Sequence, residues 1–374
     1  MSKDAIDFSQ LSRVLVVRLM HHGDVLLSSP VFTVLKKHAP QVEIDALVYH
    51  ETRDMLTLHP AIARVFTIDR NWKRQGVWTQ LKQEWRLFSQ LKARGYQLIV
   101  VLNASNRATT LVRLLKPRWS VAPDLPGAGR YFRKTFTHRQ ALTPPNTRHI
   151  VEMHLDALRR LGLFADDEDT SLSIRYEDED GLRVDAMLAE HGLQAGRFLL
   201  VHPGSRWFYK CWPAERMAKL IAELQRQGWP VALSGAPSPE EAAMIAAVKA
   251  GLTQPVADLS GQLSLKQLAA LIARARLLVG VDSLPMHMAA AVQTPVVALF
   301  GPSRDKVWGP WRVAHRQVSL DLPCRPCNLP GCGGSERSAC IENISVGQVL
   351  AAVQDLLRET ADAGVPDAAP RALP

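Results

Sequence analysis

The amino-acid sequence predicts an α/β fold of two doubly wound units, each with a mostly parallel sheet. Apolar runs of strand length alternate with helical patterns in both halves, a βαβ rhythm typical of parallel sheets. The 374 residues exceed the usual size of one domain, and the composition, 47% hydrophobic and 22% charged, is globular. Acidic clusters in 165–170 and 176–181 place the junction between the units.

From this junction we predict an N-terminal domain over residues 1–175 and a C-terminal domain over residues 176–360. Residues 361–374 are mostly Ala, Pro and Asp without an apolar period, which favours a disordered tail. In open α/β sheets, ligands bind beyond the carboxyl ends of the strands. We therefore expect two Rossmann-like domains that face an interdomain cleft, with the chemistry in that cleft.

In the first half, a strand over 13–19 leads into a helix over about 26–37. The remaining predicted elements of this half are strands at 42–48, 65–68 and 98–102 and a long helix at about 76–94. The second half repeats the rhythm. Its predicted elements are strands at 198–202, 231–234, 277–281 and 296–300, a helix that begins at Pro213, and helices at about 239–250 and 265–274.

Positive charge is concentrated in the first half. Residues 1–160 hold 25 Lys and Arg against 12 Asp and Glu, whereas residues 161–374 hold 20 against 24. This field favours an anionic partner such as a nucleic acid, a phosphorylated glycan or an acidic membrane surface, and the alternative is a merely solvated surface. Basic residues alternate with Trp72, Trp78 and Trp85 in the segment 70–94, which suits an anionic membrane interface or a phosphosugar. Alternatively, the tryptophans pack into the core.

The sequence also favours a cytoplasmic location. The start, MSKDAIDFSQ, is polar and carries two acids, unlike a secretory signal. The longest charge-free stretch, residues 283–303, is broken by proline and glycine and therefore predicts no transmembrane segment.

A single carboxylate, Asp24, lies in the segment HHGDVLLSSP, residues 21–30, directly after an apolar run. We predict that Gly23 forms a hinge between strand and helix, so that Asp24 lies on the first βα turn of the N-terminal domain. A carboxylate in that position is a candidate general base.

Small and basic residues follow three strands of the second half. Gly204 and Ser205 form a small turn, and Lys210 offers a mobile positive charge before a helix. Asp282 or Ser283 is expected to cap the next helix, whose first turn also carries His287. The third turn is Phe300 to Ser303. Together these loops indicate a nucleotide diphosphate site, although each by itself also fits an ordinary loop or cap.

Four cysteines, Cys324, Cys327, Cys332 and Cys340, are clustered in the sequence. Their spacing fits either a structural zinc site or reduced, packed thiols. Known nucleotide fingerprints are missing, since neither GxxxxGK[ST] nor GxGxxG after a strand occurs. Walker-type ATPases and standard nicotinamide dehydrogenases are therefore disfavoured.

In combination and order, these motifs resemble those of the ADP-heptose:lipopolysaccharide heptosyltransferases, family 9 of the glycosyltransferases. The resemblance covers residues 12–358 and rests on Gly23 to Pro30, His202 to Ser205 with Lys210, Trp212 and Pro213, Ser234 to Pro237 with Glu240 and Glu241, Asp282 and Ser283 with Pro285 to Ala291, Phe300 to Ser303, and the four clustered cysteines. The start is most similar to the branch called heptosyltransferase III, which adds the third heptose of the inner core. Many relatives have Gly where Leu284 stands.

The resemblance implies a GT-B fold and a metal-independent transfer that inverts the anomeric carbon, with no cofactor needed for catalysis. It implies that Asp24 is the general base and that Glu240 binds the nucleoside. The expected ligands of the donor diphosphate are Gly204, Ser205, Lys210, Asp282, Ser283 and His287. The expected donor is ADP-heptose and the expected acceptor a lipopolysaccharide core, at the inner face of the cytoplasmic membrane and without nucleic acid.

Two alternatives stay open at this point. A transferase of the same fold could use another nucleotide sugar or another core acceptor. A zinc-ribbon protein that binds nucleic acid would also account for the pI near 9.5 and the four clustered cysteines.

Overall fold

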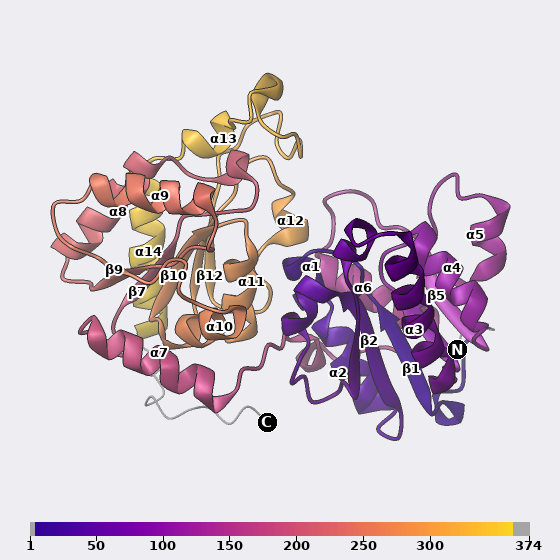
Figure 1. Ribbon diagram of the computed structural model, residues 1–374. Helices are drawn as coiled ribbons and strands as arrows, with labels where there is room; N and C mark the ends of the chain where they lie inside the picture. The colour runs from indigo at the N-terminus through magenta and orange to yellow at the C-terminus, as the bar shows by residue number, and fades with distance from the viewer. Residues whose placement is uncertain (1–3, 362–374) are drawn as a thin grey trace. The chain divides into compact units, whose positions relative to one another are not determined.

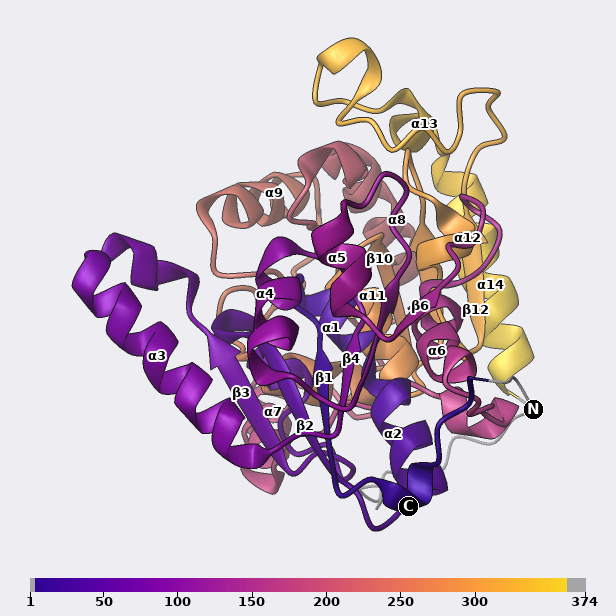
Figure 2. The same cartoon turned by 90° about the vertical axis from the view of Figure 1, so that its right-hand side faces the viewer.

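The computed structural model describes residues 4–361, so the expected tail lies outside the described residues apart from Ala361, the last residue of helix α14. The chain divides into two compact units, with the boundary between Arg175 and Tyr176. Among the described residues, each unit contains one parallel sheet with helices on both faces (Figure 1, Figure 2). The predicted α/β class with two Rossmann-like units is confirmed.

The sheet of the N-terminal unit has the strand order β3-β2-β1-β4-β5-β6. Its strands are β1 (Arg13–Val17), β2 (Glu43–Tyr49), β3 (Arg64–Ile68), β4 (Leu98–Val101), β5 (Trp119–Pro123) and β6 (His138–Gln140). Its helices are α1 (His22–Leu26), α2 (Ser29–His38), α3 (Val77–Arg94), α4 (Asn106–Leu115), α5 (Arg130–Thr135) and α6 (Ile150–Arg160). Leu15, Val17 and Ile99 of the sheet pack with Leu91 of α3 and Val112 of α4 in one hydrophobic core.

The sheet of the C-terminal unit has the order β12-β11-β10-β7-β8-β9. Its strands are β7 (Leu199–His202), β8 (Val231–Leu233), β9 (Ala257–Asp258), β10 (Leu277–Val281), β11 (Val296–Leu299) and β12 (His315–Val318). Its helices are α7 (Asp178–Glu190), α8 (Ala214–Arg226), α9 (Pro239–Ala250), α10 (Leu265–Arg274), α11 (Leu284–Ala291), α12 (Asp305–Trp308), α13 (Ala339–Glu342) and α14 (Val346–Ala361). The core includes fully buried Trp212, whose indole Nε1 donates to the Ile344 carbonyl at 3.0 Å.

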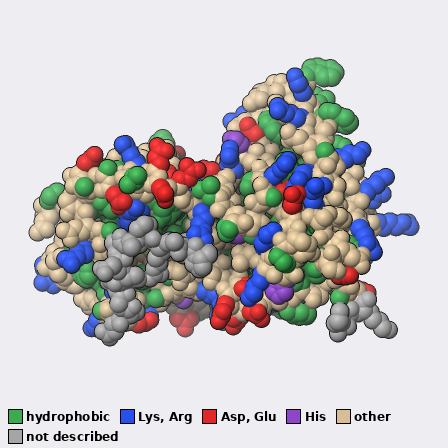
Figure 3. Space-filling view, turned by 90° about the horizontal axis from the view of Figure 1, so that it is seen from below, with side chains coloured by type: hydrophobic (Ala, Val, Ile, Leu, Met, Phe, Trp, Pro, Cys, Tyr) green, Lys and Arg blue, Asp and Glu red, His purple; other side chains and the backbone are tan. Residues whose placement is uncertain are grey.

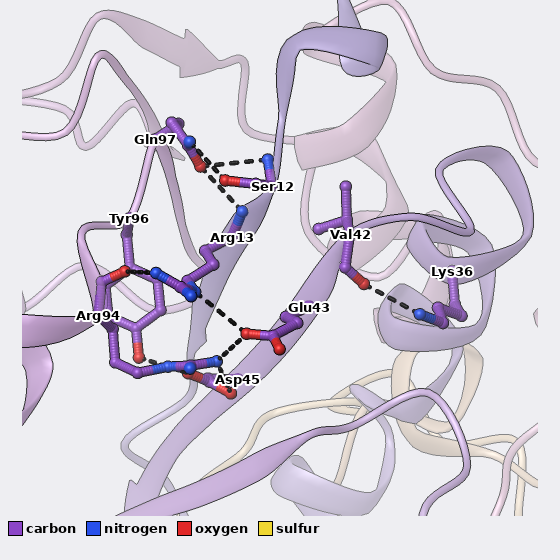
Figure 4. A network of polar contacts seen from close by, with 9 residues as sticks. All are labelled: Ser12, Arg13, Lys36, Val42, Glu43, Asp45, Arg94, Tyr96 and Gln97. Carbon is purple, nitrogen blue, oxygen red and sulfur yellow. Dashed lines mark hydrogen bonds and ion pairs between the residues drawn. The ribbon is translucent and has the colours of Figure 1, made fainter.

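A buried polar network fixes the amino-terminal side of the first sheet (Figure 4). Asp45 of β2 is fully buried and accepts hydrogen bonds from Arg94 Nε and from the Tyr96 hydroxyl, both at 2.7 Å. Burial, reinforced by the bond to Asp45, raises the pKa of Tyr96, so the phenol keeps its proton and donates it. Because Arg94 is the last residue of α3, this network holds one end of that helix against β2.

No helix between residues 4 and 361 is long and apolar enough to cross a lipid bilayer.

Candidate active site

The two sheets share one topology. Read from the first strand of each unit, both follow the order 3-2-1-4-5-6, so the strand order reverses between β1 and β4 and between β7 and β10. Ligands of such sheets bind beyond the carboxyl ends of the strands at this reversal. Asp24 follows β1, Gly204 to Lys210 follow β7, and Asp282 to His287 follow β10. The predicted residues therefore lie in the connections where this topology places ligands.

In the N-terminal unit, Asp24 forms an ion pair that the sequence motifs did not indicate. Arg18 Nη2 donates to Asp24 Oδ1 at 2.8 Å, and the two side chains are only 6% and 14% exposed. Arg18 Nη1 also donates to the Leu102 carbonyl at 3.1 Å, which ties the connection after β1 to the end of β4. Arg18 is thus a site residue that sequence reasoning missed. The only feature of the sequence that could have indicated this pair is that Arg18 stands six positions before Asp24.

The expected glycine hinge is wrong. Gly23 is the second residue of the short helix α1, and Asp24 is the third, on its first turn. The chain turns earlier, between the end of β1 at Val17 and His21, which caps α1 in an extended conformation. A carboxylate on the first turn of a helix is favoured by the exposed N–H groups there, so Asp24 suits a helical position.

A buried histidine lies beside this ion pair. His154 of α6 is 2% exposed, and its Nδ1 lies 3.0 Å from the Leu27 carbonyl oxygen. Burial, and then the positive charge of Arg18, lower the pKa of His154 well below its usual value. Burial also lowers the pKa of Arg18, against the opposing effect of Asp24. His154 is therefore neutral near pH 7, and Asp24 is the group that balances the buried guanidinium.

In the C-terminal unit, the structure brings three predicted residues together. Lys210, at the end of the 3-10 helix Phe208–Lys210, places Nζ 2.7 Å from Asp282 Oδ2. Ser205 is buried, and its hydroxyl donates to the Asp282 backbone carbonyl at 3.3 Å. The connection after β7 is thereby bonded to the connection after β10. Lys210 is held in this pair and is not the mobile charge that the sequence suggested.

The start of α11 differs from the expected cap. Ser283 occupies the N-cap position but makes no side-chain capping bond, and its hydroxyl donates instead to the Val281 carbonyl at 3.3 Å. The Asp282 carboxylate is bonded to Lys210, so the expected side-chain cap is wrong. The first-turn N–H groups of α11 are not taken by Ser283. His287 lies on this helix and is buried.

A second acid, Glu241, is built into the same region. Its Oε2 accepts from the Ala236 N–H at 2.7 Å and lies 3.7 Å from His202 Nε2, whereas its neighbour Glu240 is exposed. A Cβ on Gly204 would lie 2.5 Å from the same oxygen, so Glu241 accounts for a glycine at position 204. Burial lowers the pKa of His202, although Glu241 opposes this shift. The site prediction named Glu240 and missed Glu241, because sequence alone does not show which neighbour points inward.

The third small-residue turn serves packing. Arg325, within the cysteine segment, donates to the Gly301 carbonyl at 2.7 Å, and a Cβ on Gly301 would lie 3.0 Å from the Ile341 Cβ. The turn from Phe300 to Ser303 is therefore covered by later parts of the chain.

The clustered cysteines differ in their surroundings. Cys324 and Cys332 are exposed, Cys327 is half-buried and Cys340 is buried, and none of them forms a disulfide. Burial raises the pKa of the Cys340 thiol. Within residues 4–361, no group of three or more His, Cys, Asp or Glu side chains is arranged to hold a metal ion.

A cavity of about 280 Å³ opens on the N-terminal unit. Its lining residues are Tyr49, Asp69, Arg70, Trp72, Lys73, Gln80, Glu84 and Arg107. The Arg70 guanidinium lies over the Tyr49 ring at 3.7 Å, and Arg107 is paired with Glu84. The lining combines cations, acids, an amide and aromatic rings, and these polar side chains can form hydrogen bonds to a polar ligand.

Comparisons with known proteins bear on the family and the fold of this chain. The lipopolysaccharide heptosyltransferase 3 of Escherichia coli K12 is 34% identical over 296 residues, which are 78% of this chain and 83% of that protein. A crystal structure of a family 9 glycosyl transferase from Veillonella parvula superposes with a TM-score of 0.80 at 25% identity and covers 96% of this chain and 100% of that one. The ADP-heptose lipopolysaccharide heptosyltransferase II of E. coli shares the fold, with a TM-score of 0.72 at 20% identity over 93% of this chain and 99% of that one.

The fold of both units is therefore the GT-B fold expected from the motifs, and a zinc ribbon does not describe the chain as a whole. Residues 84–333 match glycosyltransferase family 9 (heptosyltransferase). With this match over most of its length and a relative at 34% identity, the chain belongs to glycosyltransferase family 9 and is a glycosyltransferase of the heptosyltransferase family.

Proposed function

We propose that this enzyme transfers a heptose from ADP-heptose to a heptose of the lipopolysaccharide inner core, as a heptosyltransferase III. The 34% identity to the lipopolysaccharide heptosyltransferase 3 of E. coli supports the assignment to this step of core synthesis. The name of the related ADP-heptose lipopolysaccharide heptosyltransferase II supports ADP-heptose as the donor. The observation that carries the mechanism is the presence of two partly buried ion pairs, Arg18 with Asp24 and Lys210 with Asp282, at the strand reversals of the two sheets.

The C-terminal unit is proposed to hold the donor. Lys210 carries three N–H donors and uses one of them on Asp282, so it can still donate to a diphosphate. Gly204 and Ser205 lie on the same connection, and Ser283 and His287 belong to the start of α11, whose N–H groups and dipole favour an anion. In this arrangement Asp282 contributes by fixing Lys210. Glu240 is exposed, which leaves its carboxylate accessible to the nucleoside.

Asp24 is proposed to act as the general base. Pairing with Arg18 engages Oδ1 and holds the carboxylate in place, so the second oxygen can accept the proton of the acceptor hydroxyl. The hydroxyl oxygen forms a bond to the anomeric carbon from the face opposite the leaving group. The bond to the ADP oxygen breaks, and ADP departs with the electron pair, so the anomeric configuration inverts. Lys210 stabilises the negative charge that develops on the diphosphate.

We further propose that no divalent ion takes part in this chemistry, because Lys210 and the start of α11 supply positive charge to the leaving group. Activity is then expected to be unchanged by a chelator. Zinc at the four clustered cysteines would be purely structural, and a metal analysis of the purified protein tests it. A chelator-sensitive turnover that Mg²⁺ restores would contradict the proposal.

The acceptor is proposed to bind the N-terminal unit. This part of the chain carries the excess of positive charge, and Arg70, Lys73 and Arg107 line its cavity, which suits a phosphorylated oligosaccharide. Because such an acceptor is anchored by lipid, the enzyme is proposed to work as a peripheral protein at the inner face of the cytoplasmic membrane.

The test is a transfer reaction with purified enzyme, ADP-heptose and core acceptors that lack defined heptoses. Mass spectrometry should show the addition of one heptose to an acceptor that already carries two, with release of ADP. Transfer from a different nucleotide sugar, or to an acceptor without heptose, would instead support the same-fold alternative. Absence of transfer to every core acceptor would overturn the proposed function.

A further inference from the structure

Helix α3 presents a second apolar face to the outside of the N-terminal unit. Trp78 is 85% exposed, Trp85 69%, Val77 71% and Leu81 56%. Trp78, Leu81 and Trp85 are spaced by three and four residues, so they lie on one side of the helix. The buried residues of this helix, Leu87 and Leu91, are separate from this exposed set. The alternative that the tryptophans pack into the core is therefore wrong for Trp78 and Trp85.

The helix runs along the edge of its unit, beside β3 (Figure 2). In the space-filling view, the projection at the upper right, where α3 lies, carries hydrophobic side chains next to Lys and Arg (Figure 3). Large apolar side chains exposed together on a soluble surface mark interaction sites more often than chance. We call Val77, Trp78, Leu81 and Trp85 the α3 outer stripe.

Within the segment 71–94, positive charge borders the α3 outer stripe and no acid is exposed. The exposed charged residues between positions 71 and 94 are Lys73, Arg74, Lys82, Arg86 and Lys92. The one acid in this segment, Glu84, is half-buried and bonded to Arg107. A surface of this kind fits a partner of uniform negative charge.

We propose that the α3 outer stripe docks on an anionic lipid bilayer, with Trp78 and Trp85 at the level of the headgroups. Tryptophan favours the interface between membrane and water, and neighbouring Lys and Arg attract anionic lipids. A helix with this composition lies in the interface plane and does not span the bilayer. A protein partner fits less well, because Lys is depleted in protein interfaces. The choice of a bilayer rests on the proposed function, since the proposed acceptor is anchored by lipid.

The test is co-sedimentation of the purified protein with vesicles, in the absence of any sugar substrate. Wild-type protein should bind vesicles that contain phosphatidylglycerol and should bind phosphatidylcholine vesicles at least about tenfold more weakly, with salt weakening the binding. The variant Trp78→Ser/Trp85→Ser should lose at least about tenfold in binding to phosphatidylglycerol vesicles. Leu114→Ser, which removes another exposed apolar side chain of the same unit, is the matched control and should bind like wild type.

A second pair of variants tests whether vesicle binding depends on the charges of α3 in particular or only on the total charge of the protein. Lys82→Glu/Arg86→Glu should abolish vesicle binding, whereas Arg133→Glu/Lys134→Glu, which changes the charge equally on exposed α5, should retain it. Equal losses in both pairs, or full binding by the tryptophan variant, would overturn the docking proposal. With a water-soluble core oligosaccharide as acceptor, the tryptophan variant should keep wild-type turnover. If the proposed function is wrong, neither the wild type nor any of these variants should transfer heptose, but their binding to vesicles should be as described above.

Discussion

In the N-terminal unit, the carboxylate of Asp24 is bonded to Arg18 within one strand-to-helix connection, whereas in the C-terminal unit Asp282 is bonded to Lys210 from a different connection. The cation of the first pair is more buried than that of the second, since the Arg18 side chain is 6% exposed and the Lys210 side chain 19% exposed. A fixed guanidinium leaves the carboxylate as the reactive partner, and an accessible ammonium remains able to bind a ligand. In the proposed mechanism, the same topology therefore holds the base in one unit and the anion site in the other.

The largest expected effect is that of Asp24→Asn, which removes the base and keeps the size of the side chain. Loss of general base catalysis should lower kcat by about 10²- to 10⁴-fold. Steady-state kinetics of heptose transfer measure the change. Asp54→Asn, at a carboxylate that is 45% exposed in the same unit, should keep wild-type kcat. A kcat of Asp24→Asn within a few-fold of wild type would remove Asp24 from the mechanism.

Lys210→Ala should have the next largest effect. Without the ammonium, the departing diphosphate loses its charge stabilisation and Asp282 is left unpaired, so kcat/KM for the donor should fall by about 10²-fold. Lys219→Ala, at an exposed lysine on α8, provides the control. Unchanged donor kinetics in Lys210→Ala would show that the pair with Asp282 is only structural.

Gly204→Ala tests how tightly Glu241 packs against the connection that carries Gly204 and Ser205. The added methyl would lie 2.5 Å from Glu241 Oε2, so the free energy of unfolding should fall by about 1–3 kcal/mol. Gly347→Ala, where the new methyl meets nothing within 4 Å inside α14, should be neutral or slightly stabilising. Urea denaturation of both variants measures the difference, and equal midpoints would argue against a tight contact at position 204.

The smallest expected effect is on how the free energy of unfolding depends on pH. It again differs between the two units, through buried His154 in one and buried His202 in the other. His154 and His202 have lowered pKa values in the fold, so the unfolded chain binds protons first as the pH drops. The stability that each contributes is present above its unfolded pKa of about 6.5 and is lost as the pH falls below it, by up to about 1.4 kcal/mol per pH unit.

Because Arg18 adds to the shift at His154 and Glu241 opposes the shift at His202, His154→Gln should flatten the acid dependence more than His202→Gln. Urea midpoints between about pH 7 and pH 5.5 measure the slopes. A steeper slope for His154→Gln than for wild type would reverse the assigned sign.

Local signals allowed much of the fold to be predicted. The bounds of α9, α10 and β10 agree with the expected ranges, because Ser238 caps α9 and Ser264 with Gln267 forms a capping box at α10. Strands β6 and β9 contain three and two residues, too few for a recognisable period. The helix expected over 26–37 corresponds to α2, which begins later, at Ser29, and Leu26 belongs instead to the separate short helix α1.

The candidate site was harder to predict from the sequence than the fold, because its ion pairs depend on the tertiary structure. Lys210 and Asp282 are 72 residues apart, and their bond depends on β7 and β10 being neighbours in the sheet. The predicted strand over 13–19 includes Arg18, whereas β1 ends at Val17, so the sequence pattern gives no reason to pair Arg18 with Asp24. Glu241 and Glu240 are adjacent, and only the tertiary structure shows that Glu241 is the buried one.

The division of labour between the two ion pairs can be tested by calorimetric titration of ADP into wild type, Asp24→Asn and Lys210→Ala. We predict that Asp24→Asn binds ADP as tightly as wild type although its turnover is lost, and that Lys210→Ala binds ADP at least about tenfold more weakly. Loss of ADP binding in Asp24→Asn, or wild-type binding in Lys210→Ala, would contradict the assignment of base and anion site to the two units.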